Sequence, residues 1–183
     1  MVTEWDGHAT AQVWRPGTYP GLVLYRVSGR ATTQALHVHD ELQLTLDAGH
    51  VQQVCCGGVR LMAPPGSLVV IPPGEVHALH AESGRPGVLC GMLVPVALLR
   101  PPSRRGWEDE DVALVDDLFP GGGAVLDDPD VARDFVALHR ALRGLGAEPG
   151  AHLSPLLSRL LARLREGRGG LSASWEGEHR ASP

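Results

Sequence analysis

The chain has 183 residues, of which 43% are apolar, so it is long enough to form one globular domain with a hydrophobic core. Its formal net charge of −5 argues against a domain that neutralises a phosphate backbone, because such domains are usually basic. The first residues lack a secretory signal pattern, and no later stretch approaches the roughly 18 apolar residues of a membrane span. We therefore expect a cytoplasmic protein that neither enters a membrane nor binds DNA through this chain.

Glycine and proline are frequent, with 23 and 15 residues, which favours tight turns between short strands. The three cysteines, Cys55, Cys56 and Cys90, lack the C-x-x-C spacing of a zinc site. Neighbouring residues of a strand point to opposite faces, so Cys55 and Cys56 do not form a shared site. We interpret all three as packing residues.

Short apolar runs separated by turn residues occupy the chain from residue 21 to about residue 100. No helical stretch of useful length interrupts them, which favours antiparallel strands in a sandwich or barrel over a parallel arrangement. The predicted strands comprise residues 21–28, 35–46, 51–56, 59–63, 67–72, 75–82 and 88–99.

A helical pattern follows, within residues 107–166. Asp128 followed by Pro129 is typical of an N-cap and the first residue of a helix. Ser154 followed by Pro155 predicts the start of another helix. The first helix carries a narrow apolar seam and the second a broader apolar stripe. We expect both faces to pack inside this chain, and the alternative is that the seam also contacts a second subunit. The seam comprises Val131, Phe135, Leu138, Leu142 and Leu145, and the stripe Leu156, Leu157, Leu160, Leu161 and Leu164.

A polar face along residues 37–45 contains two histidines. Because side chains alternate across a strand, the face is predicted to hold His37, His39, Glu41, Gln43 and Thr45. Leucines and Val38 take the other face, which must be buried. Alternation alone leaves open whether the polar face meets solvent or the interior of a barrel.

The spacings around these histidines resemble the paired motifs of the cupin superfamily. The first is His-x-His-x3-Gln, formed by His37, His39 and Gln43, and the second is Gly-x5-Pro-x-Gly-x2-His, which runs from Gly66 to His77. In cupins, two His and a Glu from the first motif and one His from the second converge inside a β-barrel. The resemblance implies that His37, His39 and His77 are metal ligands and that Gln43 stands where the usual Glu would be.

Three imidazoles suit a divalent transition metal such as Zn, Ni, Cu or Fe. The neutral amide of Gln43 should lower the affinity for the metal, although Glu41 on the same face can partly substitute. The alternative is a polar pocket without metal, in which His37, His39, Glu41, Gln43 and His77 hydrogen-bond an organic ligand. His80 and His50 are not expected to belong to the site.

Residues 36–46 and 63–82 also resemble the N-terminal, arabinose-binding-type domain of AraC/XylS transcription regulators, and the similarity continues through residues 127–142 and 155–164. It implies a mainly β fold: a cupin-like antiparallel β-barrel (jelly roll) followed by two or three α-helices. The implied parts are an N-terminal arm (1–20), the barrel (21–100), a helical dimerisation part (107–166) and a linker-like tail (167–183).

By this resemblance the barrel binds a small effector, the arm with Trp5 and Trp14 closes over it, and the helices form a homodimer. The two tryptophans are alternatively caps on the open end of the barrel. DNA would be bound only through a C-terminal helix-turn-helix half that this chain lacks. We hypothesise an effector-binding and dimerisation domain without enzymatic activity, and the alternative is a stand-alone metal-dependent cupin enzyme, an oxygenase or isomerase.

Overall fold

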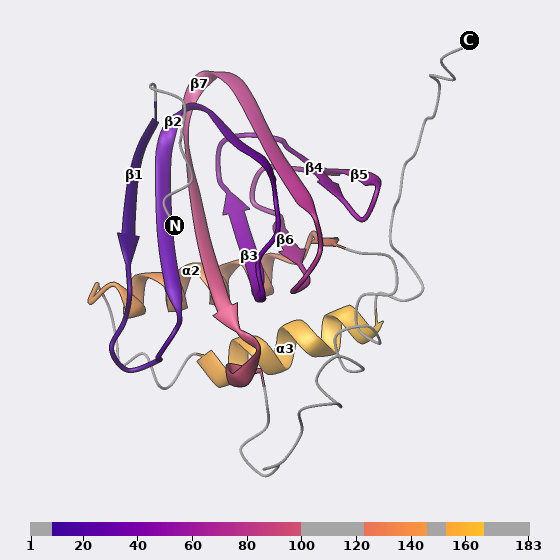
Figure 1. Cartoon of the computed structure of the whole chain (residues 1–183). Coiled ribbons are helices and arrows are strands. Elements are labelled where there is room, and N and C mark those ends of the chain that lie inside the picture. The colour runs from indigo at the N-terminus through magenta and orange to yellow at the C-terminus, as the bar shows by residue number, and fades with distance from the viewer. Residues whose placement is uncertain (1–8, 100–122, 146–152, 167–183) are drawn as a thin grey trace.

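One antiparallel sheet of eight strands dominates the computed structural model, which describes residues 9–99, 123–145 and 153–166 (Figure 1). The helices are α2 (Pro129–Leu142) and α3 (Leu153–Glu166), and a short 3-10 helix spans Val96–Leu98. The strands are β1 (Ala9–Trp14), β2 (Val23–His37), β3 (Glu41–Asp47), β4 (Gln52–Cys56), β5 (Val59–Ala63), β6 (Leu68–Ile71), β7 (His77–Pro95) and β8 (Ala124–Leu126).

Strand β7 organises the sheet because it pairs with different neighbours at its two ends. It pairs with β2 over most of its length, with β4 through residues 77–81 and with β3 through residues 89–95. The order along the sheet is β1-β2-β7-β3-β6-β8, and β5 continues outward from β4. Because β2 and β7 bend together over the top of the molecule in Figure 1, the sheet curls into a barrel. The predicted mainly β, cupin-like fold with few helices is confirmed.

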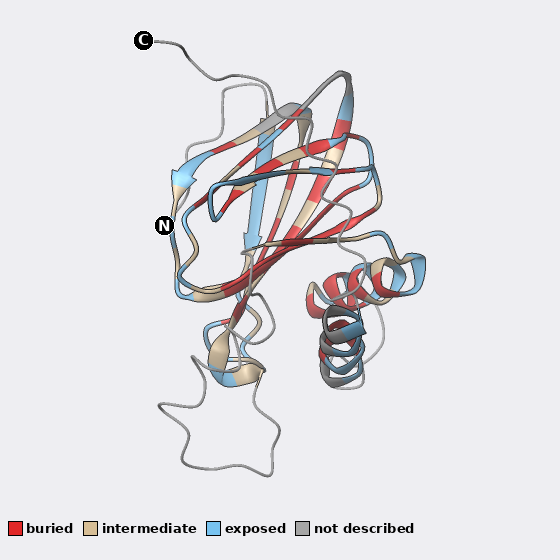
Figure 2. Ribbon diagram, turned by 90° about the vertical axis from the view of Figure 1, so that its right-hand side faces the viewer, coloured by how far each residue is buried: buried red, intermediate tan, exposed pale blue. Residues whose placement is uncertain are grey.

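The two faces of β3 lead to two different environments. Directly paired residues of neighbouring strands share a face, so Leu44 with Val70 lies on one side and Gln43 with Ile71 on the other. Leu44 and Val70 belong to a core that also contains buried residues of both helices, including Phe135. Gln43 and Ile71 instead face the barrel interior. Figure 2 shows the two helices stacked against one face of the sheet.

Helix α2 begins as the sequence predicts. The Asp128 side chain accepts hydrogen bonds from the backbone N–H groups of Asp130 and Val131, and Pro129 needs no such partner. The pKa of the Asp128 carboxyl group is lowered. The largest cause is the hydrogen bond from the Val131 N–H, and the Asp130 N–H and the Arg163 guanidinium lower it further. Arg163 of α3 contacts this carboxylate over 2.7 Å and thereby joins the two helices.

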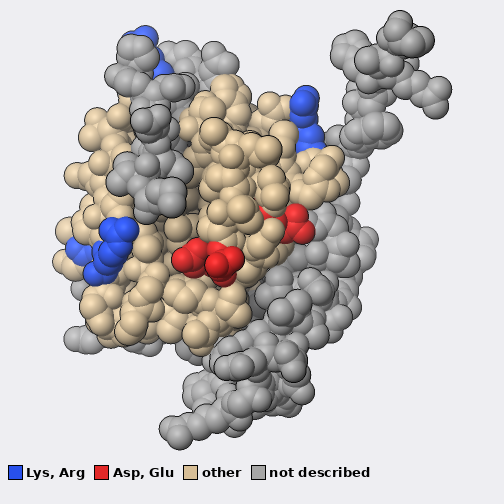
Figure 3. Space-filling view, in the orientation of Figure 1, with Lys and Arg blue, Asp and Glu red and all other residues tan. Residues whose placement is uncertain are grey.

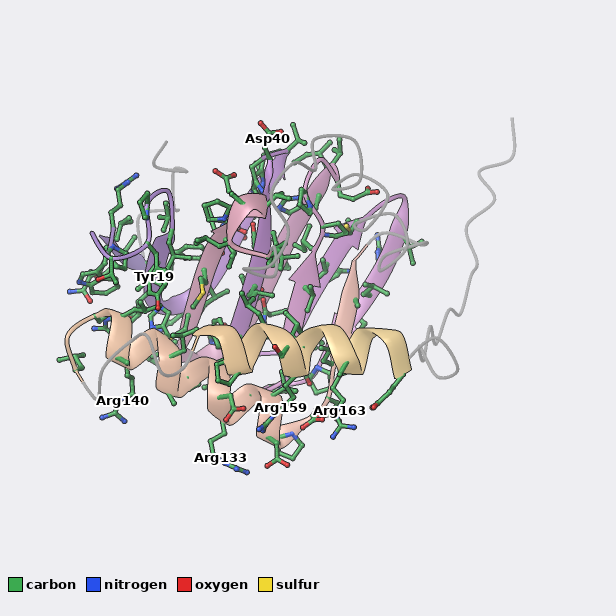
Figure 4. All side chains as sticks on the ribbon, turned by 90° about the horizontal axis from the view of Figure 1, so that it is seen from below. Tyr19, Asp40, Arg133, Arg140, Arg159 and Arg163 are labelled. Carbon is green, nitrogen blue, oxygen red and sulfur yellow. The ribbon has the colours of Figure 1, made fainter. Side chains whose placement is uncertain are left out.

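Most of the predicted seam of α2 packs within the chain. Val131, Phe135, Leu138 and Leu142 are buried between the sheet and α3, whereas Leu145 is 54% exposed. Figure 4 shows Arg133, Arg140, Arg159 and Arg163 along the outer side of the two helices. The buried part of the seam therefore serves the core of this chain.

The prediction of one strand over residues 35–46 is wrong. Strand β2 already includes residues 29–34, which were not assigned to a strand, and it ends at His37, while β3 starts at Glu41. The chain must turn in between because β2 and β3 lie on opposite sides of β7. Likewise, the expected turn at residues 83–87 lies inside β7, which is one long strand.

Two further strands lie outside the stretch predicted as the barrel. Residues 9–14 of the expected arm form β1, and residues 124–126 of the expected helical part form β8, which pairs with β6. Cys56 is buried, Cys55 and Cys90 are half-buried, and all three are free thiols. None of the described helices is long and apolar enough to cross a membrane. Trp5, residues 107–122 and the tail 167–183 lie outside the described residues.

Candidate metal and effector site

Three histidines from different parts of the chain meet at one end of the barrel. His37 is the last residue of β2 and pairs directly with His77, the first residue of β7. His39 lies in the segment that crosses from β2 to β3. The ring centroid of His77 is 4.2 Å from that of His37 and 4.9 Å from that of His39. One nitrogen of each ring lies within 4.8 Å of the other two, so the three rings can share one ion.

Backbone carbonyls hold each ring in the same protonation form. A carbonyl oxygen only accepts, so the ring nitrogen that faces it must carry the hydrogen. In all three histidines this nitrogen is Nδ1, which leaves the lone pair on Nε2. The Nδ1–H groups of His37, His39 and His77 donate to the carbonyl oxygens of Ala35, Glu41 and Glu75 over 2.7, 2.9 and 2.8 Å.

The amide oxygen of Gln43 completes the cluster. Its Oε1 lies 2.7 Å from Nε2 of His39 and 3.2 Å from Nε2 of His77, and the side chain is buried. Oxygen and nitrogen lone pairs that face one another repel unless a positive charge lies between them. Three imidazole nitrogens and an amide oxygen fit a divalent transition metal such as Zn, Ni, Cu or Fe.

His77, the most buried of the three histidines, can bind a metal without first losing a proton from its imidazole. Burial lowers the pKa of His77 to about 4, its hydrogen bond to Glu75 opposes this, and the neighbouring His37 and His39 lower it further. The imidazole of His77 is therefore neutral at physiological pH. A neutral imidazole is the form that binds a metal.

Glu41 and Thr45 lie apart from the three Nε2 atoms. The Glu41 carboxylate is 3.8 Å from Nδ1 of His39, the ring nitrogen that points away from the cluster. Thr45 is fully buried deeper along β3, where its hydroxyl donates to Oε1 of Gln52 over 3.5 Å. Of the residues predicted for the site, His37, His39, Gln43 and His77 are therefore together, and Glu41 stands beside them.

Acidic groups flank this end of the barrel. The exposed Asp40 lies in the crossing segment and is labelled in Figure 4, on the opposite side of that view from the helix arginines. Figure 3 shows acidic side chains near the centre of the face toward the viewer, with basic side chains at its margins. Such an arrangement favours the approach of a cation.

Gln34 is the site residue that the sequence analysis missed. It is 7% exposed, and its Oε1 accepts a hydrogen bond of 3.3 Å from Nε2 of Gln43. Alternation would place Gln34 and His37 on opposite faces of a regular strand. A β-bulge between them shifts the register, so both lie inside the barrel. No periodic pattern in the sequence signals this bulge.

Other polar residues lie elsewhere. His50 is buried against Asp47, with Nδ1 and Oδ2 3.0 Å apart, and His80 is exposed next to Thr33. Trp14 packs on α2, where the Arg143 guanidinium lies 4.0 Å from its ring centroid and His139 meets its edge. The expectation that Trp14 covers the effector, or caps the open end of the barrel, is therefore not what the structure shows.

A curled antiparallel barrel with a histidine cluster at one end and two helices against one face defines a cupin-type domain with a helical extension. The family of AraC-like ligand-binding domains matches residues 19–164, and the chain belongs to this family. No curated protein sequence matches the chain significantly.

Solved structures resemble the chain in fold. The AraC-like transcriptional activator CuxR superposes with a TM-score of 0.62 at 13% identity, over 87% of this chain and 57% of CuxR. A putative mannose-6-phosphate isomerase from Ralstonia eutropha JMP134 has a TM-score of 0.43 and 14% identity, over 49% of this chain and 87% of its own. A cupin superfamily protein from Desulfitobacterium hafniense DCB-2 has a TM-score of 0.42 and 7% identity, over 51% of this chain and 84% of its own.

Proposed function

We propose that this chain is the effector-sensing domain of a cytoplasmic transcription regulator and that a divalent transition metal is part of its effector site. The observation that carries the metal assignment is that one ring nitrogen of each of the three histidines lies within 4.8 Å of the others, while the amide oxygen of Gln43 faces Nε2 of His39 and of His77. Membership of the AraC-like ligand-binding family supports sensing as the role of the barrel.

Four side chains of this chain would hold the ion at the proposed metal site. His37, His39 and His77 hold the ion through Nε2, with their rings fixed by backbone carbonyls, and Gln43 adds Oε1. The bound ion would supply a Lewis acid to which an oxygen or nitrogen of a small effector can bind. Glu41 is half-exposed and lies on the Nδ1 side of His39, so it would hydrogen-bond only a part of the effector that extends past the ion.

Metal binding is tested by titrating the purified, metal-free protein with Co²⁺ and Zn²⁺ while thermal stability is recorded. We expect one ion per chain and a rise in Tm, because an ion that binds only the folded state stabilises it. His77→Ala should weaken binding by about a hundredfold or more. His80→Ala is the matched control, since His80 is exposed and outside the cluster, and it should bind as the wild type does. Equal binding by the two variants would disprove the site.

A stand-alone cupin enzyme remains the competing function, and the position of the carboxylates counts against it. Within the described chain, the Glu41 carboxylate lies on the Nδ1 side of His39 and not beside the Nε2 atoms that would surround a substrate. A general base must reach the proton that it removes. An enzyme would turn over a substrate without any DNA-binding partner domain, and this outcome separates the two functions.

We further propose that the chain forms a homodimer and that DNA is bound through a separate domain. Most of the apolar seam of α2 is buried in this chain. The candidate contact is therefore the exposed seam residue Leu145, which is 54% exposed, together with Val136, which lies outside the seam on α2 and is 37% exposed. Sedimentation analysis should give a dimer for the wild type and a monomer for Val136→Glu. A monomeric wild type would contradict this assignment.

A further inference from the structure

Gln43 is ambiguous as a metal ligand because the two ends of an amide have opposite chemistry. The carbonyl oxygen can bind a cation, whereas the NH₂ group can only donate hydrogen bonds. If the amide turned by half a rotation, its NH₂ would donate to the Nε2 lone pairs of His39 and His77, and no oxygen would face the ion. The ligand therefore depends on something that fixes which end of the amide faces the histidines.

Gln34 supplies that constraint. Its Oε1 accepts a hydrogen bond of 3.3 Å from Nε2 of Gln43, which holds the NH₂ end of Gln43 away from the histidines and its oxygen toward them. Both side chains are buried, with 7% and 1% exposure, so water does not compete freely for this contact. The contact joins β2 to β3 inside the barrel, although β7 separates these two strands in the sheet. It forms because the bulge in β2 turns Gln34 toward the interior.

Tyr25 lies close to Gln34. Its phenol is buried, and burial raises its pKa, while the neighbouring Gln34 side chain lowers it. Tyr25 itself is held tightly, because its ring covers the position where a Cβ on Gly91 would lie.

We infer that Gln34 is a positioning residue of the metal site, which makes Gln43 an oxygen ligand by accepting the hydrogen bond from its NH₂ group. This inference rests on the proposed metal site. It also accounts for how a neutral amide serves at a position where a carboxylate would bind the ion more strongly. A carboxylate has two equivalent oxygens and needs no orientation, whereas an amide requires a second residue that selects one of its ends.

The test is a double-mutant cycle measured by Co²⁺ titration of the full chain. Gln34→Leu removes the acceptor and should weaken Co²⁺ binding about tenfold, the factor that corresponds to one buried hydrogen bond. In a Gln43→Glu background the same change should alter the affinity by less than about twofold, because the carboxylate needs no orientation. Gln34→Glu, which keeps an acceptor, should bind Co²⁺ at least as well as the wild type.

Gln52→Leu is the matched control. Gln52 is also fully buried inside the barrel, but its Oε1 accepts a hydrogen bond from Thr45 and not from Gln43. The Gln52→Leu substitution should therefore leave the Co²⁺ affinity unchanged. The Co²⁺ absorption spectrum provides a second readout, since loss of an oxygen ligand changes the d–d bands while a merely structural defect lowers the metal-free Tm. Should Gln34→Leu fail to fold, Gln34→Ser replaces it, because the shorter side chain places its oxygen out of reach of Gln43. Gln34→Ser should then bind Co²⁺ more weakly than Gln34→Glu, and equal affinities would overturn the positioning role.

The outcomes separate this inference from the proposed function. If the wild type binds no Co²⁺, the metal site itself is wrong, and the role of Gln34 is wrong with it. If the wild type binds Co²⁺ but Gln34→Leu binds equally well, or loses the same factor in the Gln43→Glu background, the metal site stands and the positioning role is overturned.

Discussion

His139, on helix α2, donates a hydrogen bond of 3.1 Å from Nε2 to the backbone carbonyl oxygen of Tyr25 on β2. The ring is 2% exposed and lies in the contact between α2 and the sheet. Burial is the largest influence on its pKa and lowers it to about 4, with a smaller contribution in the same direction from Arg143. The folded protein therefore keeps His139 neutral.

This burial predicts a loss of stability on acidification. In the unfolded chain His139 has a pKa of 6.5, and in the folded protein a pKa of about 4. Between these values the unfolded chain binds more protons, so the free energy of unfolding falls as the pH is lowered from 6.5 to 4. The full shift corresponds to about 3 kcal/mol. Urea denaturation at several pH values should show a shallower decline for His139→Gln, and an unchanged decline would contradict this account.

Gly91 should not tolerate a side chain. A Cβ at this position would lie 1.9 Å from the Tyr25 ring, which must then move within a filled interior. We expect Gly91→Ala to lower the free energy of unfolding by about 2–3 kcal/mol. Gly17→Ala is the control, because nothing lies within 4 Å of the added Cβ, and its effect should stay within about 0.5 kcal/mol. Similar effects of the two substitutions in urea denaturation would refute the steric argument.

The start of α2 should depend on the oxygen of Asp128 more than on its charge. Asp128→Ala removes the acceptor for the N–H groups of Asp130 and Val131 and should cost about 1 kcal/mol of stability. Asp128→Asn keeps an oxygen acceptor and loses only the charge that faces Arg163, an ion pair near the surface, so it should cost less than about 0.5 kcal/mol. Equal losses in thermal denaturation would assign the effect to the ion pair instead.

Trp14 should connect the edge strand β1 to helix α2. Trp14→Ala removes the contact with the Arg143 guanidinium and the edge contact with His139, and should lower the free energy of unfolding by about 2 kcal/mol. Val13→Ala changes the neighbouring residue of the same strand, which is 43% exposed, and should cost less than about 0.5 kcal/mol. Hydrogen exchange of the β1 amides should increase only in the tryptophan variant.

The motif residues could be predicted because the chemistry and the turn are local. The Pro72-x-Gly74 turn precedes His77 by a short fixed distance, and Gly74 adopts a φ of 77°, which a residue with a side chain rarely adopts. Asp128 and Pro129 similarly indicate the start of α2, because the Asp128 side chain accepts its hydrogen bonds within one helical turn and Pro129 is the first helical residue. Local signals of this kind also predicted the mainly β barrel followed by helices.

The break between β2 and β3 could not be predicted from alternation. Residues 35–46 alternate well enough for one strand, and only the position of β7 between β2 and β3 requires the chain to cross at residues 38–40. His37 and His39 still face each other across this turn, with ring centroids 5.7 Å apart, although they do not share a strand. The structure brings the histidines of the two motifs together, although the strand pattern alone placed His37 and His39 in one strand.

The sequence by itself determined the class of fold, the three histidines and the amide that stands with them, because spacing and turn chemistry are properties of neighbouring residues. Tertiary structure alone decided that Gln34 joins this cluster, that Glu41 turns to the other side of His39, and that Trp14 packs on α2. Each of these contacts depends on strand register, on a bulge or on the packing of a distant helix. Such long-range pairings have no counterpart in the local pattern of residues.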